Sequence, residues 1–311
     1  MDTVADILAC PPHPRPTALT VGSFDGVHLG HRRLLDTLVR AADARGLVPA
    51  VMTLDPHPRQ LFAPASAPNS LTAVAQKNRL LAAAGVGVHF TLPFTRETAA
   101  MDREAFVRDV VVRQCGARLL LVGHDFRFGR GAAGSFEYLR EHSAAFGLEV
   151  ARVDALVLDG ECVSSTLIRE RVLQGAVEDA ARCLGRPYAL EGPVVAGRGI
   201  GRTLGFPTAN LAPGNLAVPA HGVYIAETLV DGRAWPSAVN IGIAPTVRNE
   251  DALVETHLLG FTGDLIGKTV EIIFHRRLRP EQRFSSLEDL KAAIRRDLDT
   301  VRAHFSSCPA P

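Results

Sequence analysis

Short apolar runs alternate with amphipathic helical patterns throughout the first half of the chain. The runs span 18–21, 47–54, 88–94 and 118–123, and the helical patterns between them span 32–46, 73–84 and 103–115. This alternation predicts a parallel sheet with helices on its faces, because parallel strands need long crossover connections. Ligands of such sheets bind at the carboxyl ends of the strands. We therefore expect the segments that follow three of the runs, 22–31, 55–58 and 123–129, to meet at one edge.

The pattern changes near Gly185 to closely spaced strand-like runs. These runs span 224–230, 235–242, 253–259 and 269–274. Asp231-Gly232 between the first two is typical of a tight hairpin. The segment 285–305 is one amphipathic helix, with Leu287, Leu290, Ile294, Leu298 and Val301 on its apolar face. We expect two domains: an α/β domain over 1–185, and a small antiparallel β-barrel with a C-terminal helix over 186–311.

Net charge limits the classes of partner that the protein can attract, and the cysteine content indicates its redox compartment. The formal net charge is +1, so no overall field attracts nucleic acid or an anionic membrane. The five cysteines are widely spaced and include no Cys-x-x-Cys pair, which argues against a disulfide framework and suits a reducing compartment. Residues 1–16 lack the features of a signal peptide, and no apolar run reaches the roughly 18 residues of a membrane span. We expect a cytoplasmic protein with small-molecule partners and neither a nucleic-acid nor a membrane partner.

The segment GSFDGVHLGH, residues 22–31, places His28 and His31 between glycines and ahead of a helical pattern. A zinc site would need a third ligand, and no cysteine or acidic residue stands at a suitable spacing. The two histidines could also be helix-capping or surface residues. A phosphate site explains more of the segment, because glycines permit close backbone approach and a helix N-terminus offers free N–H groups to an anion.

This segment and three later ones resemble the bifunctional riboflavin kinase/FAD synthetase family of bacteria. GSFDGVHLGH is similar to the His-x-Gly-His signature of nucleotidylyltransferases, and TLDPHP (53–58), VGHDFRFG (122–129) and VSSTLIR (163–169) are similar to further family segments in the same order. The second half is similar to the family's riboflavin kinase module over nearly its whole length. The resemblance implies a Rossmann-like nucleotidylyltransferase domain followed by a kinase β-barrel. It also implies two ATP-dependent steps, from riboflavin to FMN and from FMN to FAD and pyrophosphate.

The resemblance implies roles for residues of the first half in adenylyl transfer. His28, His31 and Arg169 would act on the reacting phosphates. The ATP-binding residues would be Gly22, Phe24, Asp25, Gly30, Asp125, Ser164, Ser165 and Thr166, and the flavin-binding residues would be Asp55, Pro56, Pro58, Phe126 and Phe128. Taken alone, residues 164–166 could be an ordinary helix N-cap, and the two phenylalanines could belong to the core.

The second half begins with a glycine-rich turn at Gly197, Gly199 and Gly201, whose spacing is not that of a dinucleotide-binding turn. PTAN (207–210) follows, and in an extended chain Thr208 and Asn210 point to the same side. The resemblance implies that the glycines and these two residues bind ATP, and that Thr208 and Asn210 hold Mg²⁺ through oxygen atoms. It assigns Glu255 as the base that takes the proton of the ribityl hydroxyl. Without it, PTAN could be a solvated turn and Glu255 an exposed strand residue.

Two positions depart from the family's pattern, and both lie in the kinase half. Ala244 stands where a polar or basic residue is expected, and Gly260 stands where the family has an aspartate before a phenylalanine. One alternative is therefore a paralogue that has only the adenylyltransferase half active or that acts on a modified flavin. Another is a flavin-binding regulator without turnover. The bifunctional enzyme is favoured over the regulator because a binding protein needs no base, and the chain has His28, His31, Asn210 and Glu255.

Overall fold

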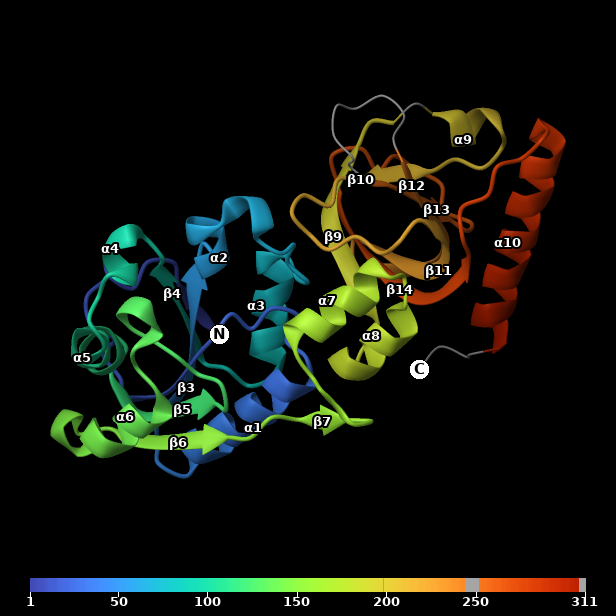
Figure 1. The fold of residues 1–311 in the computed structure, drawn as a ribbon. Helices are drawn as coiled ribbons and strands as arrows, with labels where there is room; N and C mark the ends of the chain where they lie inside the picture. The colour runs from blue at the N-terminus through green and yellow to red at the C-terminus, as the bar shows by residue number, and fades with distance from the viewer. Residues whose placement is uncertain (198, 244–251, 308–311) are drawn as a thin grey trace. The chain divides into compact units, whose positions relative to one another are not determined.

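The computed structural model describes residues 1–197, 199–243 and 252–307. The chain forms two compact units, one of residues 1–68 and 74–163 and the other of residues 69–73 and 164 onward (Figure 1). The boundary expected after residue 185 stays a prediction, and the segment 164–185 belongs to the second unit by its contacts. None of the described helices is both long and apolar enough to cross a membrane.

The first unit is built on a parallel sheet, as the alternating pattern predicts. In the described residues this sheet has six strands in the order β1-β4-β3-β2-β5-β6. Their bounds are β1 Asp2–Val4, β2 Thr17–Val21, β3 Val48–Asp55, β4 Val88–Pro93, β5 Ala117–Gly123 and β6 Glu149–Val153. The four predicted runs correspond to β2, β3, β4 and β5, whereas the edge strands β1 and β6 are not among them.

Apolar cores cover both faces of this sheet. Leu19 of β2 packs in a cluster that includes the helical residue Val107. Ala18, its neighbour in the strand, packs in a second cluster that includes Leu35. Successive side chains of a strand point to opposite faces, so both faces are buried and the strands appear in the sequence as mainly apolar runs without strict alternation.

Helices and short turns connect the strands of the first unit. They are α1 Leu29–Asp43, α2 Pro58–Phe62, η1 Pro64–Ser66, α3 Val74–Ala83, α4 Arg96–Ala99, α5 Arg103–Ala105, η2 Phe106–Gln114, η3 Arg130–Ala132, α6 Phe136–His142 and η4 Ser143–Phe146. The small hairpin of β7 Val157–Leu158 and β8 Glu161–Cys162 follows β6. The helix predicted over 103–115 is present, but η2 forms most of it and has π-helical hydrogen bonding.

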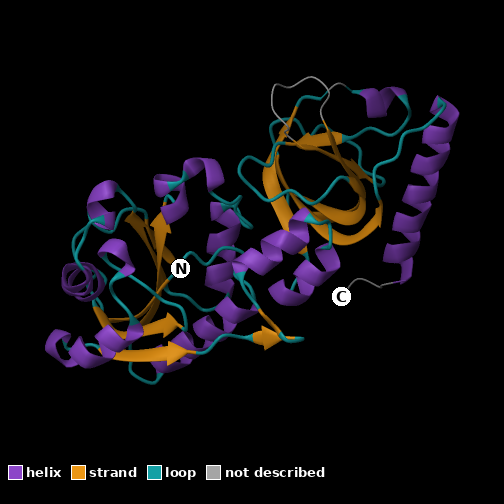
Figure 2. Cartoon of the chain, in the orientation of Figure 1, coloured by secondary structure: helices purple, strands orange, loops and turns teal. Residues whose placement is uncertain are grey.

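The second unit is a closed antiparallel barrel, which confirms the predicted architecture (Figure 2). Its strand order is β10-β13-β12-β11-β14-β9. Its elements are α7 Ser165–Leu173, α8 Val177–Leu184, β9 Tyr188–Val195, α9 Ile200–Thr203, β10 Ala209–Leu211, β11 Gly222–Val230, β12 Arg233–Ile243, β13 Ala252–Leu258, β14 Thr269–Arg279 and the C-terminal α10 Leu287–Ser307. Asp231 (φ +49°) and Gly232 (φ +80°) form the predicted hairpin turn between β11 and β12.

Candidate functional site

The predicted edge of the first unit exists. β2 lies between β3 and β5 in the sheet, and all three strands run parallel. Residues 22–31, 55–58 and 123–129 follow their carboxyl ends. The topology therefore brings the three polar segments to the place where parallel sheets bind ligands.

Residues 22–31, called here the histidine turn, have a strained backbone. Phe24 (φ +47°) and Val27 (φ +40°) occupy the left-handed region that side chains other than glycine rarely adopt. Both side chains are 1% exposed and pack in the core cluster on the α1 face of the sheet. Their burial holds the turn in a conformation of the kind that is concentrated at functional sites.

His28 and His31 stack on one another at the start of α1. Their ring centroids are 3.7 Å apart with planes 19° from parallel. His28 is also the N-cap of α1, where its Nδ1 accepts a hydrogen bond of 3.3 Å from the backbone N–H of His31. A Cβ at Gly30 would lie 3.1 Å from the His28 ring, so the glycine leaves room for the imidazole. The capping alternative is therefore true of His28, but it does not account for the stacked partner.

The environment of His31 keeps its ring neutral near pH 7. Burial, the neighbouring His28 and the charge of Lys77 hold the pKa of His31 well below its ordinary value. Its Nδ1 is buried and has no hydrogen-bond partner in the described residues.

Lys77 of α3 is a site residue that the sequence motifs did not indicate. Its Nζ donates a hydrogen bond of 3.0 Å to the carbonyl oxygen of Ser23 in the histidine turn. Burial lowers the pKa of Lys77, and the charges of Asp25 and Asp55 oppose that shift. The structure thus joins a lysine, two predicted site carboxylates and His31 electrostatically at one edge. Asp55 is exposed at the end of β3, before Pro56 and the start of α2 at Pro58.

Phe126 and Phe128 follow β5 and stack with ring centroids 5.4 Å apart. Phe128 is 7% exposed and belongs to the core cluster on the η2 face, as the core alternative suggests. Phe126 is half-buried and packs at the margin of that cluster. Asp125 is exposed. Of these aromatic rings, Phe126 therefore presents the larger surface to a ligand.

The predicted Ser-Ser-Thr segment opens α7 in the second unit. Ser164 is the N-cap, where its Oγ accepts a hydrogen bond of 3.2 Å from the N–H of Leu167. Ser165 and Thr166 are the first residues of the helix. Arg169 donates from Nε to the carbonyl oxygen of Asn69 at 2.6 Å. The N-cap alternative is therefore true of Ser164, and the helix leaves Thr166 exposed.

The barrel aligns three polar side chains across neighbouring strands. Asn210 of β10 and Asn240 of β12 are both directly opposite Glu255 of β13. Directly opposed residues of antiparallel strands share a face. Val254 and Thr256, on either side of Glu255, are fully buried inside the barrel, so the polar row lies on the outer face. Asn240 is a second site residue that the motifs did not indicate.

Glu255 has the chemistry of a base. Burial raises the pKa of its carboxyl group, and a hydrogen bond from the Asn240 side chain offsets part of that rise. A carboxylate with a raised pKa binds a proton more tightly and so accepts one more readily from a substrate hydroxyl.

The glycine-rich turn packs on the predicted nucleotide residues. A Cβ at Gly197 would clash with the side-chain amide of Asn210, and a Cβ at Gly201 would lie 3.0 Å from the Oγ of Thr208. Gly199 has φ +71°, the left-handed conformation that favours glycine. The turn therefore lies against Thr208 and Asn210.

Of the two residues that depart from the family's pattern, Gly260 and Ala244, the structure describes only Gly260. Gly260 follows β13 in an exposed turn with φ +74° and open space around it, a position where glycine is conformationally favoured. Ala244 lies outside the described residues.

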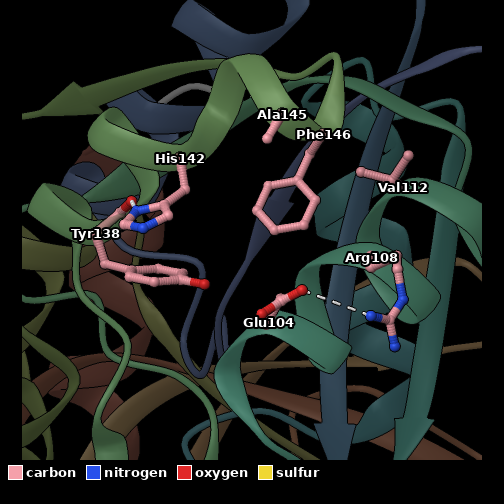
Figure 3. Close-up of a pocket in the computed structure, with 7 residues that line it drawn as sticks. All are labelled: Glu104, Arg108, Val112, Tyr138, His142, Ala145 and Phe146. Carbon is pink, nitrogen blue, oxygen red and sulfur yellow. Dashed lines mark hydrogen bonds and ion pairs between the residues drawn. The ribbon is translucent and has the colours of Figure 1, made fainter.

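A separate depression of about 410 Å³ lies in the first unit (Figure 3). It is lined by Glu104, Arg108, Val112, Tyr138, His142, Ala145 and Phe146. The rings of Tyr138 and Phe146 border it, and Glu104 and Arg108 form an ion pair of 3.6 Å beside them. None of the residues predicted to bind ATP, flavin or metal lines it. In the part of the chain that the structure describes, no three His, Cys, Asp or Glu residues are arranged to hold a metal ion.

Comparisons with known proteins match both halves. The family model of FAD synthetase matches residues 10–167, and that of riboflavin kinase matches residues 184–305. The chain is 39% identical to the bifunctional riboflavin kinase/FMN adenylyltransferase of Escherichia coli (strain K12), with 92% of each chain covered. It is 38% identical to the protein of the same description from Pseudomonas fluorescens, with 94% of each covered. A solved structure described as a macrolide-efflux protein from Streptococcus pneumoniae has a TM-score of 0.86 and 28% identity, covering 96% of this chain and 98% of that one.

Proposed function

This chain belongs to the bifunctional riboflavin kinase/FMN adenylyltransferase family, and on that premise we propose that the histidine turn serves adenylyl transfer and that Glu255 serves the kinase. The chain phosphorylates riboflavin with ATP to give FMN, and adenylylates FMN with ATP to give FAD and pyrophosphate. The stacked pair of His28 and His31 at the start of α1 supports the first assignment. The strand register that places Asn210 beside Glu255 supports the second.

Adenylyl transfer requires the protein to position phosphates rather than to supply a nucleophile. A phosphate oxygen of FMN attacks the α-phosphorus of ATP, the bond to the bridging oxygen breaks, and pyrophosphate leaves. Donors fixed around that centre stabilise the charge that develops in the transition state. We assign this role to the rings of His28 and His31 together with the free N–H groups of α1. An anion beside His31 favours the protonated ring, so phosphate binding should raise its pKa.

Other predicted residues keep their roles as proposals. For adenylyl transfer, the nucleotide ligands are Gly22, Phe24, Asp25, Gly30, Asp125, Ser164, Ser165 and Thr166, with Arg169 on a phosphate, and the flavin ligands are Asp55, Pro56, Pro58, Phe126 and Phe128. Arg169 suits a phosphate because its guanidinium presents several N–H donors in a planar fork.

In the kinase reaction, the terminal ribityl hydroxyl of riboflavin attacks the γ-phosphorus of ATP. Glu255 accepts the hydroxyl proton as the new P–O bond forms, and ADP leaves. The hydrogen bond from Asn240 orients the carboxylate. The turn that carries Gly197, Gly199 and Gly201 offers backbone N–H groups to the phosphates of ATP.

Thr208 and Asn210 fit a magnesium ion. Mg²⁺ takes oxygen ligands and usually keeps several waters, so few protein oxygens suffice. The Thr208 hydroxyl and the Asn210 amide oxygen supply such atoms. The glycine-rich turn lies so close to both side chains that a Cβ at Gly197 or Gly201 would crowd them. Held by Thr208 and Asn210, Mg²⁺ would supply positive charge that offsets the negative charge of the ATP phosphates.

We expect purified protein given riboflavin, ATP and Mg²⁺ to form both FMN and FAD, and chelation of Mg²⁺ to stop both steps. Chromatographic separation of the flavins measures each product. Accumulation of FMN without FAD contradicts the adenylyltransferase assignment. Adenylylation of supplied FMN without turnover of riboflavin contradicts the kinase assignment.

We propose a functional boundary after residue 185, with the adenylyltransferase over 1–185 and the kinase over 186–311. A fragment of residues 186–311 is expected to phosphorylate riboflavin without making FAD. A fragment that begins at Ser164 retains α8, which buries Val177 and Leu184 within the second unit. It should therefore unfold at a higher temperature than the shorter fragment while its kinase rate stays equal. A shorter fragment that folds without kinase activity contradicts the boundary.

We also propose that the protein works in the cytoplasm. Cys10, Cys115 and Cys162 form no disulfide in the described part of the chain, which suits a reducing compartment.

A further inference from the structure

Lys77 forms fewer hydrogen bonds than its ammonium group can donate. It is half-buried on α3, and its Nζ donates to Ser23 in the histidine turn at 3.0 Å. An ammonium group has three N–H donors. Within the described residues Ser23 is its only hydrogen-bond acceptor, so two donors remain for another partner.

A purely structural tether between α3 and the turn would not need a charge. Withdrawing an ammonium group from water is costly unless it is compensated. Here Asp25 and Asp55 act on Lys77 and favour its charged form. A neutral donor would hold Ser23 without that cost, so the retained cation points to an anionic ligand.

The position of Lys77 beside the histidine pair indicates which anion. The charge of Lys77 lowers the pKa of His31, and the Nζ of Lys77 contacts the histidine turn at the carbonyl oxygen of Ser23. A lysine held against a turn that carries two imidazoles suits a ligand with several negative oxygens, because such a ligand stabilises the charged form of each group. Phosphate groups are the anions that adenylyl transfer brings to this edge.

We propose that Lys77 is a further phosphate-binding residue of the adenylyltransferase, donating its remaining N–H groups to phosphoryl oxygens of the reacting nucleotide. This inference rests on the proposed function of the histidine turn. The same ammonium group, held by Ser23, also fixes the turn relative to α3 and disfavours protonation of His31 until the phosphates bind.

The test uses two variants of the full chain. Lys77→Met keeps the length of the side chain and removes the charge, and Lys77→Arg keeps the charge. We expect Lys77→Met to slow FAD formation from FMN and ATP by about 10²–10³-fold, the scale for loss of one preorganised donor. It should weaken the binding of inorganic pyrophosphate, measured by calorimetry, by about 10-fold or more. Lys77→Arg should restore most of both, and riboflavin phosphorylation should stay near wild type in each.

An NMR titration of His31 separates a charged role from a tether. Removal of the Lys77 charge should raise the pKa of His31, whereas the Arg variant should leave it near the wild-type value. His28, Asp25 and Asp55 also act in this region and are unchanged in both variants. The inference fails if Lys77→Met keeps its FAD rate and pyrophosphate affinity while His31→Ala loses FAD formation. If the histidine variants are also fully active, the proposed function itself is wrong.

Discussion

We expect Glu255→Gln to slow FMN formation from riboflavin by about 10²–10⁴-fold, the usual contribution of a general base. Glutamine keeps the size and most of the hydrogen bonding of glutamate but cannot take the proton of the ribityl hydroxyl. FAD synthesis from supplied FMN should continue at the wild-type rate, because Glu255 lies in the barrel. Separate assays of the two reactions on the same preparation measure this difference. Glu288→Gln, an exposed change in the first turn of α10, is the matched control and should leave both rates unchanged.

The pH dependence of the kinase gives a second readout of the same base. The carboxyl must be ionised to accept a proton, and burial raises the pKa of Glu255 above its ordinary value. The rate should therefore fall on acidification at a higher pH than an exposed glutamate would produce. Asn240→Leu removes the donor that favours the ionised form, so this limb should move to still higher pH. A Gln variant that phosphorylates riboflavin at close to the normal rate contradicts the assignment and means that the proton leaves by another route.

The parts of the fold that the sequence predicts are those with a strong periodic signal. β2 and β5 are mostly buried and appear as short, mainly apolar runs. Asp231-Gly232 specifies its hairpin through a backbone conformation that few other pairs adopt. β6 has no such signal, because it is an edge strand with exposed Glu149 and Arg152. The membership of residues 69–73 in the second unit likewise depends on long-range pairing, such as Ser70 with Leu216, that no local pattern reveals.

The candidate site shows the same division. His28, His31, Thr208 and Asn210 stand in short motifs that combine glycine, proline and polar residues, so the amino-acid sequence alone indicates them. Lys77 lies in α3, a helix that connects two strands and carries no binding motif. The contact of Lys77 with the histidine turn forms only when α3 packs beside that turn. Asn240 becomes significant only when the barrel register places it opposite Glu255. Residues that act through tertiary contacts are therefore the ones that motif reasoning misses.

Substitution of the histidine pair should give the other large effect, on FAD formation rather than FMN formation. We expect His31→Ala to slow adenylylation of FMN by about 10²–10³-fold, because one preorganised donor at the phosphates is lost. His28 requires a different design, since its Nδ1 also caps α1 and loss of an N-cap typically costs about 0.5–2 kcal/mol of stability. His28→Asn keeps a good capping side chain but removes the imidazole. His28→Ala removes both the cap and the imidazole.

The paired variants separate capping from phosphate chemistry. His28→Asn should match the wild-type melting temperature and still lose FAD formation, whereas His28→Ala should lose both stability and FAD formation. The melting temperature reports whether the first unit of each variant is folded, and riboflavin phosphorylation in the same tube shows that the barrel is intact. If His28→Asn makes FAD at the normal rate, His28 is only a helix cap and the phosphate assignment must rest on His31 and Lys77. Equal loss of both reactions would indicate misfolding, and loss of bound zinc together with activity would favour a metal site instead. We expect neither equal loss of both reactions nor loss of bound zinc. The two stacked imidazoles lie at the N-terminus of α1, where an anion is stabilised without a metal.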